Sequence, residues 1–296
     1  MPTALPSPQV LEITGADAVA FAHAQFASDV RALGNGHWHW SAWLSAQGRV
    51  RAFFRVLRIG DEHLLLILQG GSAETLRAAL APFVFRAKVQ MRVAGTWQAI
   101  GVDRHDDVLE YLGAAPGPTE TVITNDHIGV ALPGPQPRWY VLGGTLPATL
   151  DTSPAALNRW NAADVAAGLV EIGEAQVDRF LPSWLGLDQL GAVSVRKGCY
   201  PGQEIVARLH FKGGNKRWLQ QLAFRADVVP APGTSLITVD HDAGASGEVL
   251  RAAWTESGRG LALATLPKLP AGTALTAPGM PGASFRVVSS IDGPSD

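Results

Sequence analysis

Apolar residues recur at helix or strand intervals through the first half of the chain. Residues 15–34 carry Val19, Phe21, Phe26 and Val30 at roughly helical intervals, so we expect a helix, or a helix and a following turn, capped by Thr14 and ending near Gly34. Three strands are expected over residues 37–44, 50–59 and 63–68. Their short, glycine-bearing breaks favour hairpins, and hence an antiparallel meander.

Further elements follow the meander. A helix is expected over residues 72–83, and strands are expected near residues 85–93, 97–102, 121–123, 127–131 and 138–142. A second helix is expected over residues 153–168, with Pro154 in its first turn. The order of these elements is that of an α+β region with antiparallel sheets, without a βαβ repeat.

The last part of the chain has a different pattern of apolar and polar residues. Six short strand-like segments are separated by Gly, Pro, Asp and Ser, at residues 218–226, 234–239, 247–254, 260–266, 273–277 and 285–290. This spacing predicts a small all-β domain, a barrel or a sandwich. We therefore divide the chain into an α+β region of two interwoven subdomains over residues 1–214 and a β domain over residues 215–296.

Composition and charge narrow the function classes. The 296 residues are 47% hydrophobic and 17% charged, with a formal net charge of −2 and a pI near 6.4, which argues against direct nucleic-acid binding by the surface as a whole. The longest aliphatic run, residues 64–68, is too short to span a bilayer, and the first residues lack a secretory pattern. A single cysteine cannot form an internal disulfide, so we expect a protein of the reducing cytoplasm.

The one cysteine lies in a cationic stretch. Residues 196–217 hold Cys199 and Glu204 among six cationic side chains, Arg196, Lys197, Arg208, Lys212, Lys216 and Arg217. Positive neighbours favour the thiolate, which is the form of cysteine that reacts or binds metal. Pro201 predicts a helix that starts just after Cys199, and the amides of a helix N-terminus also attract anions. The alternative is a solvated basic loop beside a structural cysteine.

A metal site is weakly supported. His37 and His39 lie two apart on an expected strand and so face the same side, but a zinc site needs three or four ligands. No third ligand lies near them in the sequence, and we therefore predict no metal site.

Residues 197–204 read Lys-Gly-Cys-Tyr-Pro-Gly-Gln-Glu, which resembles the K-G-C-Y-x-G-Q-E signature of the YgfZ family. That family is related to the T-protein of the glycine cleavage system, an aminomethyltransferase. Residues 15–18, 28–30, 47–49 and 215–217 are similar to other phrases of the family, so the resemblance covers nearly the whole chain.

The resemblance implies a three-domain aminomethyltransferase-like ring with antiparallel sheets and a small C-terminal β-barrel. It also implies that tetrahydrofolate binds in a central channel. The implied role is assembly or repair of iron–sulfur clusters in client enzymes, among them tRNA-thiolating enzymes, and it leaves open whether the protein is itself a catalyst. Cys199 is then the functional thiol, and Lys197 accompanies it in the signature.

Six residues are candidates for folate contacts. Gln203 and Glu204 match the signature, and Asp29 matches the opening pattern of the family. From charge alone, Arg208, with Lys212 and Arg217, is expected to steer the anionic tail of folate. From ring surface alone, Trp43 or Trp218 is expected to stack on the pterin.

Other functions remain open at this stage. One is a folate-dependent one-carbon enzyme, an aminomethyltransferase or a demethylase-like protein. Another is an RNA-contacting module built on the basic stretch, which the acidic overall balance opposes. The last is a basic loop with a purely structural role.

Overall fold

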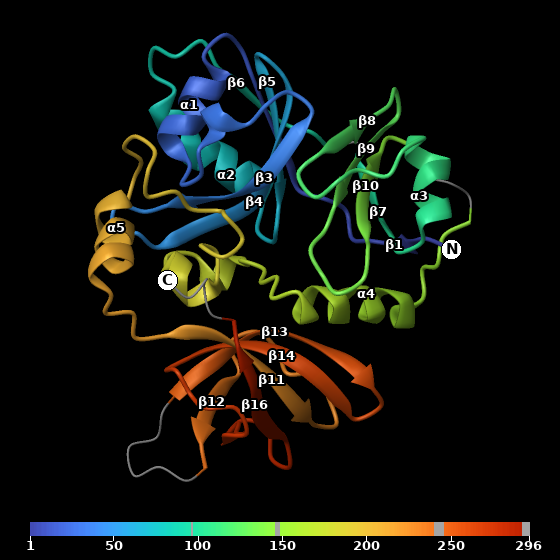
Figure 1. Ribbon diagram of the computed structural model, residues 1–296, viewed down its shortest axis with the longest axis vertical. Coiled ribbons are helices and arrows are strands. Elements are labelled where there is room, and N and C mark those ends of the chain that lie inside the picture. Colours follow the sequence, from blue (N-terminus) through green and yellow to red (C-terminus); the bar gives the residue numbers. More distant parts are fainter. Residues whose placement is uncertain (96, 146–148, 240–245, 292–296) are drawn as a thin grey trace.

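The computed structural model describes residues 1–95, 97–145, 149–239 and 246–291. Three lobes surround a common centre (Figure 1): two five-stranded antiparallel sheets and one closed six-stranded barrel. The expected α+β class with antiparallel sheets and a C-terminal β-barrel is confirmed. Within the described ranges, no helix is both long and apolar enough to cross a membrane.

The first lobe is a sheet covered on one face by two helices. In spatial order its strands are β3 (His37–Leu44), β4 (Val50–Gly60), β5 (His63–Leu68), β2 (Val10–Thr14) and β6 (Gln90–Val93). Helices α1 (Ala18–Gln25) and α2 (Ala73–Leu80) cover it, followed by the 3₁₀ turns η1 (Val30–Ala32) and η2 (Ala81–Phe83). The predicted meander over residues 37–68 is confirmed.

Strand β4 is buried on both faces. Phe54 and Val56 pack in the core beneath the two helices, whereas Phe53 and Leu57 belong to the core shared with the other lobes. Alternate residues of a strand point to opposite faces, so one strand serves both cores. The first lobe is therefore joined to the rest of the molecule through the uncovered face of its sheet.

Two local predictions in this lobe are wrong. Thr14 is the last residue of β2, and α1 has Asp17 at its N-cap position; the Asp17 carboxylate accepts a hydrogen bond from the Lys88 amide at 2.7 Å instead. The strand expected from residue 85 begins only at Gln90, because the chain turns before it. Phe85 adopts a positive φ of 26° and is 86% exposed.

The second lobe is built from the N-terminus and the middle of the chain. Its strands are β1 (Thr3–Ala4), β7 (Gln98–Val102), β10 (Trp139–Gly143), β9 (His127–Ala131) and β8 (Thr121–Ile123). Helix α3 (His105–Leu112), which the sequence patterns did not predict, packs on this sheet through Val108 and Leu112. Helix α4 (Pro154–Ala166) has Pro154 in its first turn, as expected, and the Ser153 side chain caps it.

The third lobe is the barrel. Its strands follow the order β11 (Trp218–Arg225), β14 (Arg259–Leu266), β13 (Ser246–Glu256), β12 (Ser235–Thr238), β15 (Ala274–Thr276) and β16 (Ser284–Ser290). Each of the six predicted segments overlaps one barrel strand. The predicted domain boundary at residues 214 and 215 stays a prediction.

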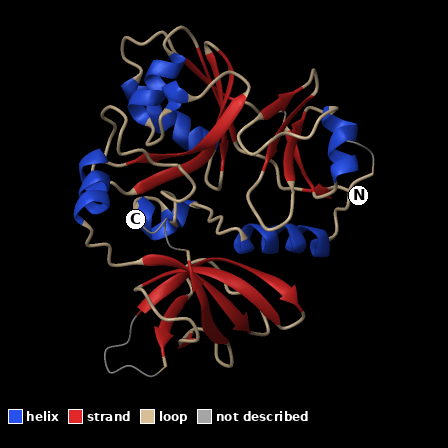
Figure 2. Ribbon diagram, viewed as in Figure 1, coloured by secondary structure: helices blue, strands red, loops and turns tan. Residues whose placement is uncertain are grey.

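Helix α4 connects the second sheet to the barrel. Figure 2 shows it lying between them. Trp160 packs so closely on β7 that a side-chain Cβ at Gly101 would lie 2.4 Å from the indole ring. Asn158 exchanges two hydrogen bonds with the backbone of Trp254 on β13, at 2.9 and 3.0 Å. The two lobes are thereby fixed around the same centre.

Candidate functional site

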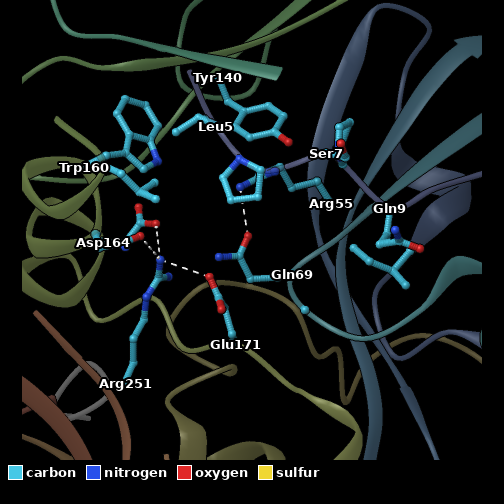
Figure 3. A pocket seen from close by; sticks show the side chains of 16 residues that line it. Leu5, Ser7, Gln9, Arg55, Gln69, Tyr140, Trp160, Asp164, Glu171 and Arg251 are labelled. Atoms are coloured by element: carbon cyan, nitrogen blue, oxygen red, sulfur yellow. Dashed lines mark hydrogen bonds and ion pairs between the residues drawn. The ribbon is translucent and has the colours of Figure 1, made fainter. Parts of the chain in front are cut away.

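A pocket of about 210 Å³ lies where the three lobes meet, and we call it the central pocket (Figure 3). The first lobe contributes Arg55 on β4 and Gln69 just after β5, and the second contributes Tyr140 on β10. Helix α4, the segment after it and barrel strand β13 contribute the other charged lining residues, Asp164, Glu171 and Arg251. No single lobe could form this pocket.

Buried ion pairs form one wall of the central pocket. The Asp164 carboxylate lies between the guanidinium groups of Arg138 and Arg251, with a separation of 2.9 Å to Arg251. These three side chains are at most 9% exposed. Arg251 also contacts the half-exposed Glu171 at 3.0 Å. The pairing compensates each charge, because an unpaired charge in such a place costs several kcal/mol.

Arg55 forms the opposite wall without a carboxylate. Its guanidinium donates to the Gln69 side-chain oxygen at 2.9 Å and lies over the rings of Trp40 and Tyr140, at 4.8 and 4.5 Å. Among the described residues, its Nε has no hydrogen-bond partner. Burial lowers the pKa of Arg55 and raises the pKa of the Tyr140 hydroxyl to about 12. The pocket therefore offers a buried cation, a free donor and a neutral phenol to a ligand.

The Cys199 segment, residues 194–203, is fastened to the first lobe by a lysine. The buried Lys197 ammonium donates to the backbone carbonyls of His23, Phe26 and Ser28, the last at 3.1 Å. Two of these carbonyls lie at the C-terminal end of α1, where a cation is favourable. Burial lowers the pKa of Lys197 to about 8. Lys197 is thus a structural anchor for the segment that presents Cys199.

Two stretches singled out in the sequence meet at the end of this segment. Gly202, at a φ of +80°, precedes helix α5 (Gln203–Lys212) and lies against the hairpin turn that contains Gly48. A Cβ at Gly202 would lie 2.5 Å from the Ser45 carbonyl oxygen and 2.6 Å from the Gly48 Cα. Only glycine fits this approach. Cys199 itself is exposed just before α5.

Two histidine contacts lie beneath the Cys199 segment. His23 Nδ1 is 3.1 Å from a carboxylate oxygen of Asp29, and His39 Nε2 is 2.9 Å from the Ser28 hydroxyl. Burial lowers the pKa of His23, and it lowers the pKa of His39 to about 4. Both rings are therefore neutral at physiological pH. Within the described ranges, no cluster of three or more metal-ligating side chains is present.

The structure brings some of the predicted site residues together. Asp29, Lys197 and Cys199 all lie at or beneath the Cys199 segment, and the Gln203 side chain donates to the Lys197 carbonyl at 3.2 Å. Glu204 follows Gln203 on α5 but is exposed to solvent. The signature residues thus form one local structure rather than a pocket.

The remaining candidates for folate contacts lie apart from one another. Trp43 is buried in β3 between the Arg51 guanidinium and the edge of Phe83, and it lines a separate cavity of about 240 Å³. Arg208 is exposed on α5, and Trp218 begins the barrel strand β11. The lining of the central pocket includes none of the residues predicted for folate, Asp29, Trp43, Gln203, Glu204, Arg208 and Trp218. Their role in folate binding stays a prediction.

Sequence reasoning missed the residues that line the central pocket, although a signal was present. Arg55 interrupts a strand that is apolar on both faces, and Asp164 falls among the apolar positions of α4. A charge in a core pattern is expected to be paired or functional. However, a charged residue in an apolar pattern does not show which residues, distant in the sequence, will contact it in the fold.

Comparison with known proteins defines the class. No family profile matches the sequence. The fold is similar to that of the glycine cleavage system aminomethyltransferase T from Bartonella henselae, with a TM-score of 0.72 and 14% identity over 97% of this chain and 84% of that one. The three lobes therefore have the aminomethyltransferase fold.

Curated relatives narrow the class further. An uncharacterized protein of Haemophilus influenzae is 30% identical over 211 residues, which cover 71% of this chain and 68% of the relative. The tRNA-modifying protein YgfZ of Cronobacter sakazakii is 29% identical over 276 residues, with 84% and 79% coverage. YgfZ of Escherichia coli is 27% identical over 259 residues, with 83% and 79% coverage. The chain belongs to the YgfZ family.

Proposed function

We propose that this protein binds tetrahydrofolate in the central pocket and supports assembly or repair of iron–sulfur clusters in client enzymes, including enzymes that thiolate tRNA. Cys199 is the proposed functional thiol. The naming of YgfZ relatives as tRNA-modifying proteins supports the choice of clients. Such clients act in the cytoplasm, which is the proposed place of action.

The observation that carries the folate proposal is the uncompensated Arg55 in the central pocket. A pterin presents amino and ring N–H donors beside a carbonyl acceptor on a flat ring. The free Arg55 Nε could donate to the carbonyl, while Glu171 and the Gln69 side-chain oxygen could accept from the donors. The rings of Tyr140 and Trp160 supply flat apolar walls.

The size of the central pocket sets how much of a folate it can enclose. Pockets that bury a whole drug-sized ligand are about 300–1,000 Å³ in volume. At about 210 Å³, this pocket is suited to the pterin ring and leaves the glutamate tail nearer to solvent. The chain's own residues would thus bind and orient the ring and exclude water from it.

Calorimetry with tetrahydrofolate tests the pocket. Glu171→Gln removes an anionic acceptor at a half-exposed position, so the fold should survive. We expect affinity to fall about tenfold or more, since a hydrogen bond to a charged group contributes about 1.5–3 kcal/mol. Glu204→Gln is the matched control on the exposed face of α5. If Glu204→Gln weakens binding and Glu171→Gln does not, the pterin is not in the central pocket.

Complementation tests the thiol separately. In a strain that lacks this protein, we expect Cys199→Ala to leave iron–sulfur enzyme activity near the level of the deletion, while Cys199→Ala protein still binds folate. Full restoration by the alanine variant would remove the thiol from the function. Production of methylene-tetrahydrofolate by the purified protein would favour a one-carbon enzyme instead.

A further inference from the structure

Helix α5 is the only α-helix of the described chain without a buried residue. It follows Cys199 directly and lies at the outer edge of the molecule (Figure 1). Near its C-terminal end Phe211 is 71% exposed, with the His210 ring 4.9 Å away. A surface helix normally buries one apolar stripe. Here the apolar side chains Val206, Leu209 and Phe211 are left partly or largely uncovered.

A cavity of about 640 Å³ opens beside this helix, and we call it the α5 cavity. Its walls come from α5 and from the segments on either side of residue 188. Aliphatic lining residues are Leu181, Val193, Val195, Val206 and Leu209; Phe211 and His210 are aromatic, and Ser183, Asp188 and Asn215 are polar. Its volume lies within the range of about 300–1,000 Å³ that is typical of ligand-binding sites. An open hollow of this size with partly exposed aliphatic side chains in its wall is typical of an interaction site.

Exposed cationic residues adjoin the lining of the α5 cavity in the sequence. Arg196 follows the lining residue Val195, Lys216 follows the lining residue Asn215, and Lys212 ends α5; all three cationic side chains are exposed. Asp188 is the acidic side chain in the cavity lining. The whole chain has a formal net charge of −2, so this region is opposite in sign to the protein's average. A partner with acidic residues would be attracted to it.

We propose that the α5 cavity docks an acidic segment of a partner protein, which inserts an apolar side chain between α5 and residues 181–195. The acidic residues of the docked segment then contact Arg196, Lys212 and Lys216, and Cys199 precedes the N-terminus of the same helix. The aliphatic part of the wall suits a leucine-like side chain, whereas successive bases of single-stranded RNA stack on a series of aromatic faces, and the lining offers only Phe211 and its neighbour His210. Only the identification of the partner as a client enzyme rests on the proposed function.

The single cysteine allows a direct test by disulfide tethering. Each probe peptide carries a cysteine, as its mercaptoethanol disulfide, and a flexible Gly-Ser spacer. The Cys199 thiolate attacks that disulfide and releases mercaptoethanol, so the conjugate fraction at rising mercaptoethanol reports local binding. Four probes are compared on the full-length protein: acidic with leucines, acidic with serines, basic with leucines, and a thiol-ended single-stranded RNA.

We expect the acidic leucine peptide to stay conjugated at about tenfold higher mercaptoethanol than the other three probes, which corresponds to about 1.4 kcal/mol. Phe211→Ser should reduce its retention to that of the serine peptide, and Lys212→Glu with Lys216→Glu should do the same. Phe85→Ser is the matched control, because Phe85 is 86% exposed in the first lobe. It should change nothing.

Two outcomes would overturn the proposal. Equal retention of all four probes would show that the α5 cavity has no selectivity, and stronger retention of the RNA would make the surface a nucleic-acid site. Because the assay contains neither folate nor an iron–sulfur cluster, its failure leaves the proposed function standing. Failure of the calorimetric or complementation test likewise leaves the docking result intact.

Discussion

The central pocket and the Cys199 segment both depend on buried charges, but the charges are satisfied in different ways. In the pocket, Asp164 is held by arginines from β13 and from the residue before β10, so the pairing joins the barrel, α4 and the second sheet. At the segment, Lys197 donates to neutral backbone carbonyls of the first lobe and lies over the Tyr200 ring at 4.8 Å, with no carboxylate among these contacts. The pocket therefore depends on the assembly of all the lobes, whereas the segment depends on one.

The largest expected effect comes from neutralising the acid of the central pocket. Asp164→Asn leaves the buried Arg138 guanidinium without its carboxylate and leaves Arg251 with only the half-exposed Glu171, so we expect the free energy of unfolding to fall by about 3–5 kcal/mol. Chemical denaturation measures this loss. Glu256→Gln is the control, because its pair with Arg259 is exposed and should contribute less than about 1 kcal/mol.

Alkylation of the sole cysteine sharpens the same comparison. In folded Asp164→Asn protein, the rate at which iodoacetamide modifies Cys199 should stay close to that of the wild type. A large change in that rate would show that the central pocket and the Cys199 segment are coupled. It would contradict the conclusion that the segment depends on the first lobe alone.

The substitution Lys197→Met is expected to cause the next largest loss of stability. The methionine fills the space but donates nothing to three carbonyls, and an unsatisfied buried acceptor costs about 1–3 kcal/mol, so we expect a loss of about 2–3 kcal/mol. Because the segment loses its anchor, iodoacetamide should modify Cys199 at a changed rate while tetrahydrofolate affinity is retained. Lys216→Met, on the exposed surface, is the control and should change neither the free energy of unfolding nor the rate at which Cys199 is modified.

The pH dependence of stability tests the charge on Lys197. Burial lowers its folded pKa to about 8, whereas the unfolded value is near 10.5. Between these values the unfolded chain binds the proton that the native protein has lost, so this group makes stability rise as pH increases from about 8 to 10.5. The wild-type free energy of unfolding, measured relative to Lys197→Met, should therefore increase across this window. A constant difference would mean that Lys197 titrates with its ordinary pKa.

The two regions also differ in how far the sequence predicted them. The residues of the Cys199 segment are consecutive, so its signature can be recognised in the sequence as a motif. The meander and the six barrel segments could be predicted from the local periodicity of apolar residues. The central pocket is assembled from residues as distant as Arg55 and Arg251, and nothing local specifies that they meet. The role of Lys197 was missed for the same reason, because its three carbonyl partners lie near residue 25.

The surroundings of α5 were likewise not specified by the sequence. A cluster of cations in the sequence says nothing about which cavity each cation faces. Arg208 was expected to guide the folate tail, yet it is exposed on α5 and is not part of the central pocket lining. The apolar residues Val206, Leu209 and Phe211 of the same helix line an open cavity.

The smallest expected effect is that of Arg208→Ala on tetrahydrofolate affinity, and it tests whether the folate tail lies along α5. Because Arg208 lies outside the central pocket, we expect Arg208→Ala to change tetrahydrofolate affinity by less than about twofold in calorimetry, which is below 0.5 kcal/mol by RT ln 2. Glu171→Gln, measured beside it, should show the far larger loss. A tenfold loss with Arg208→Ala would instead place the folate tail along α5, and the contrast between a ligand pocket and a thiol segment would give way to one continuous site.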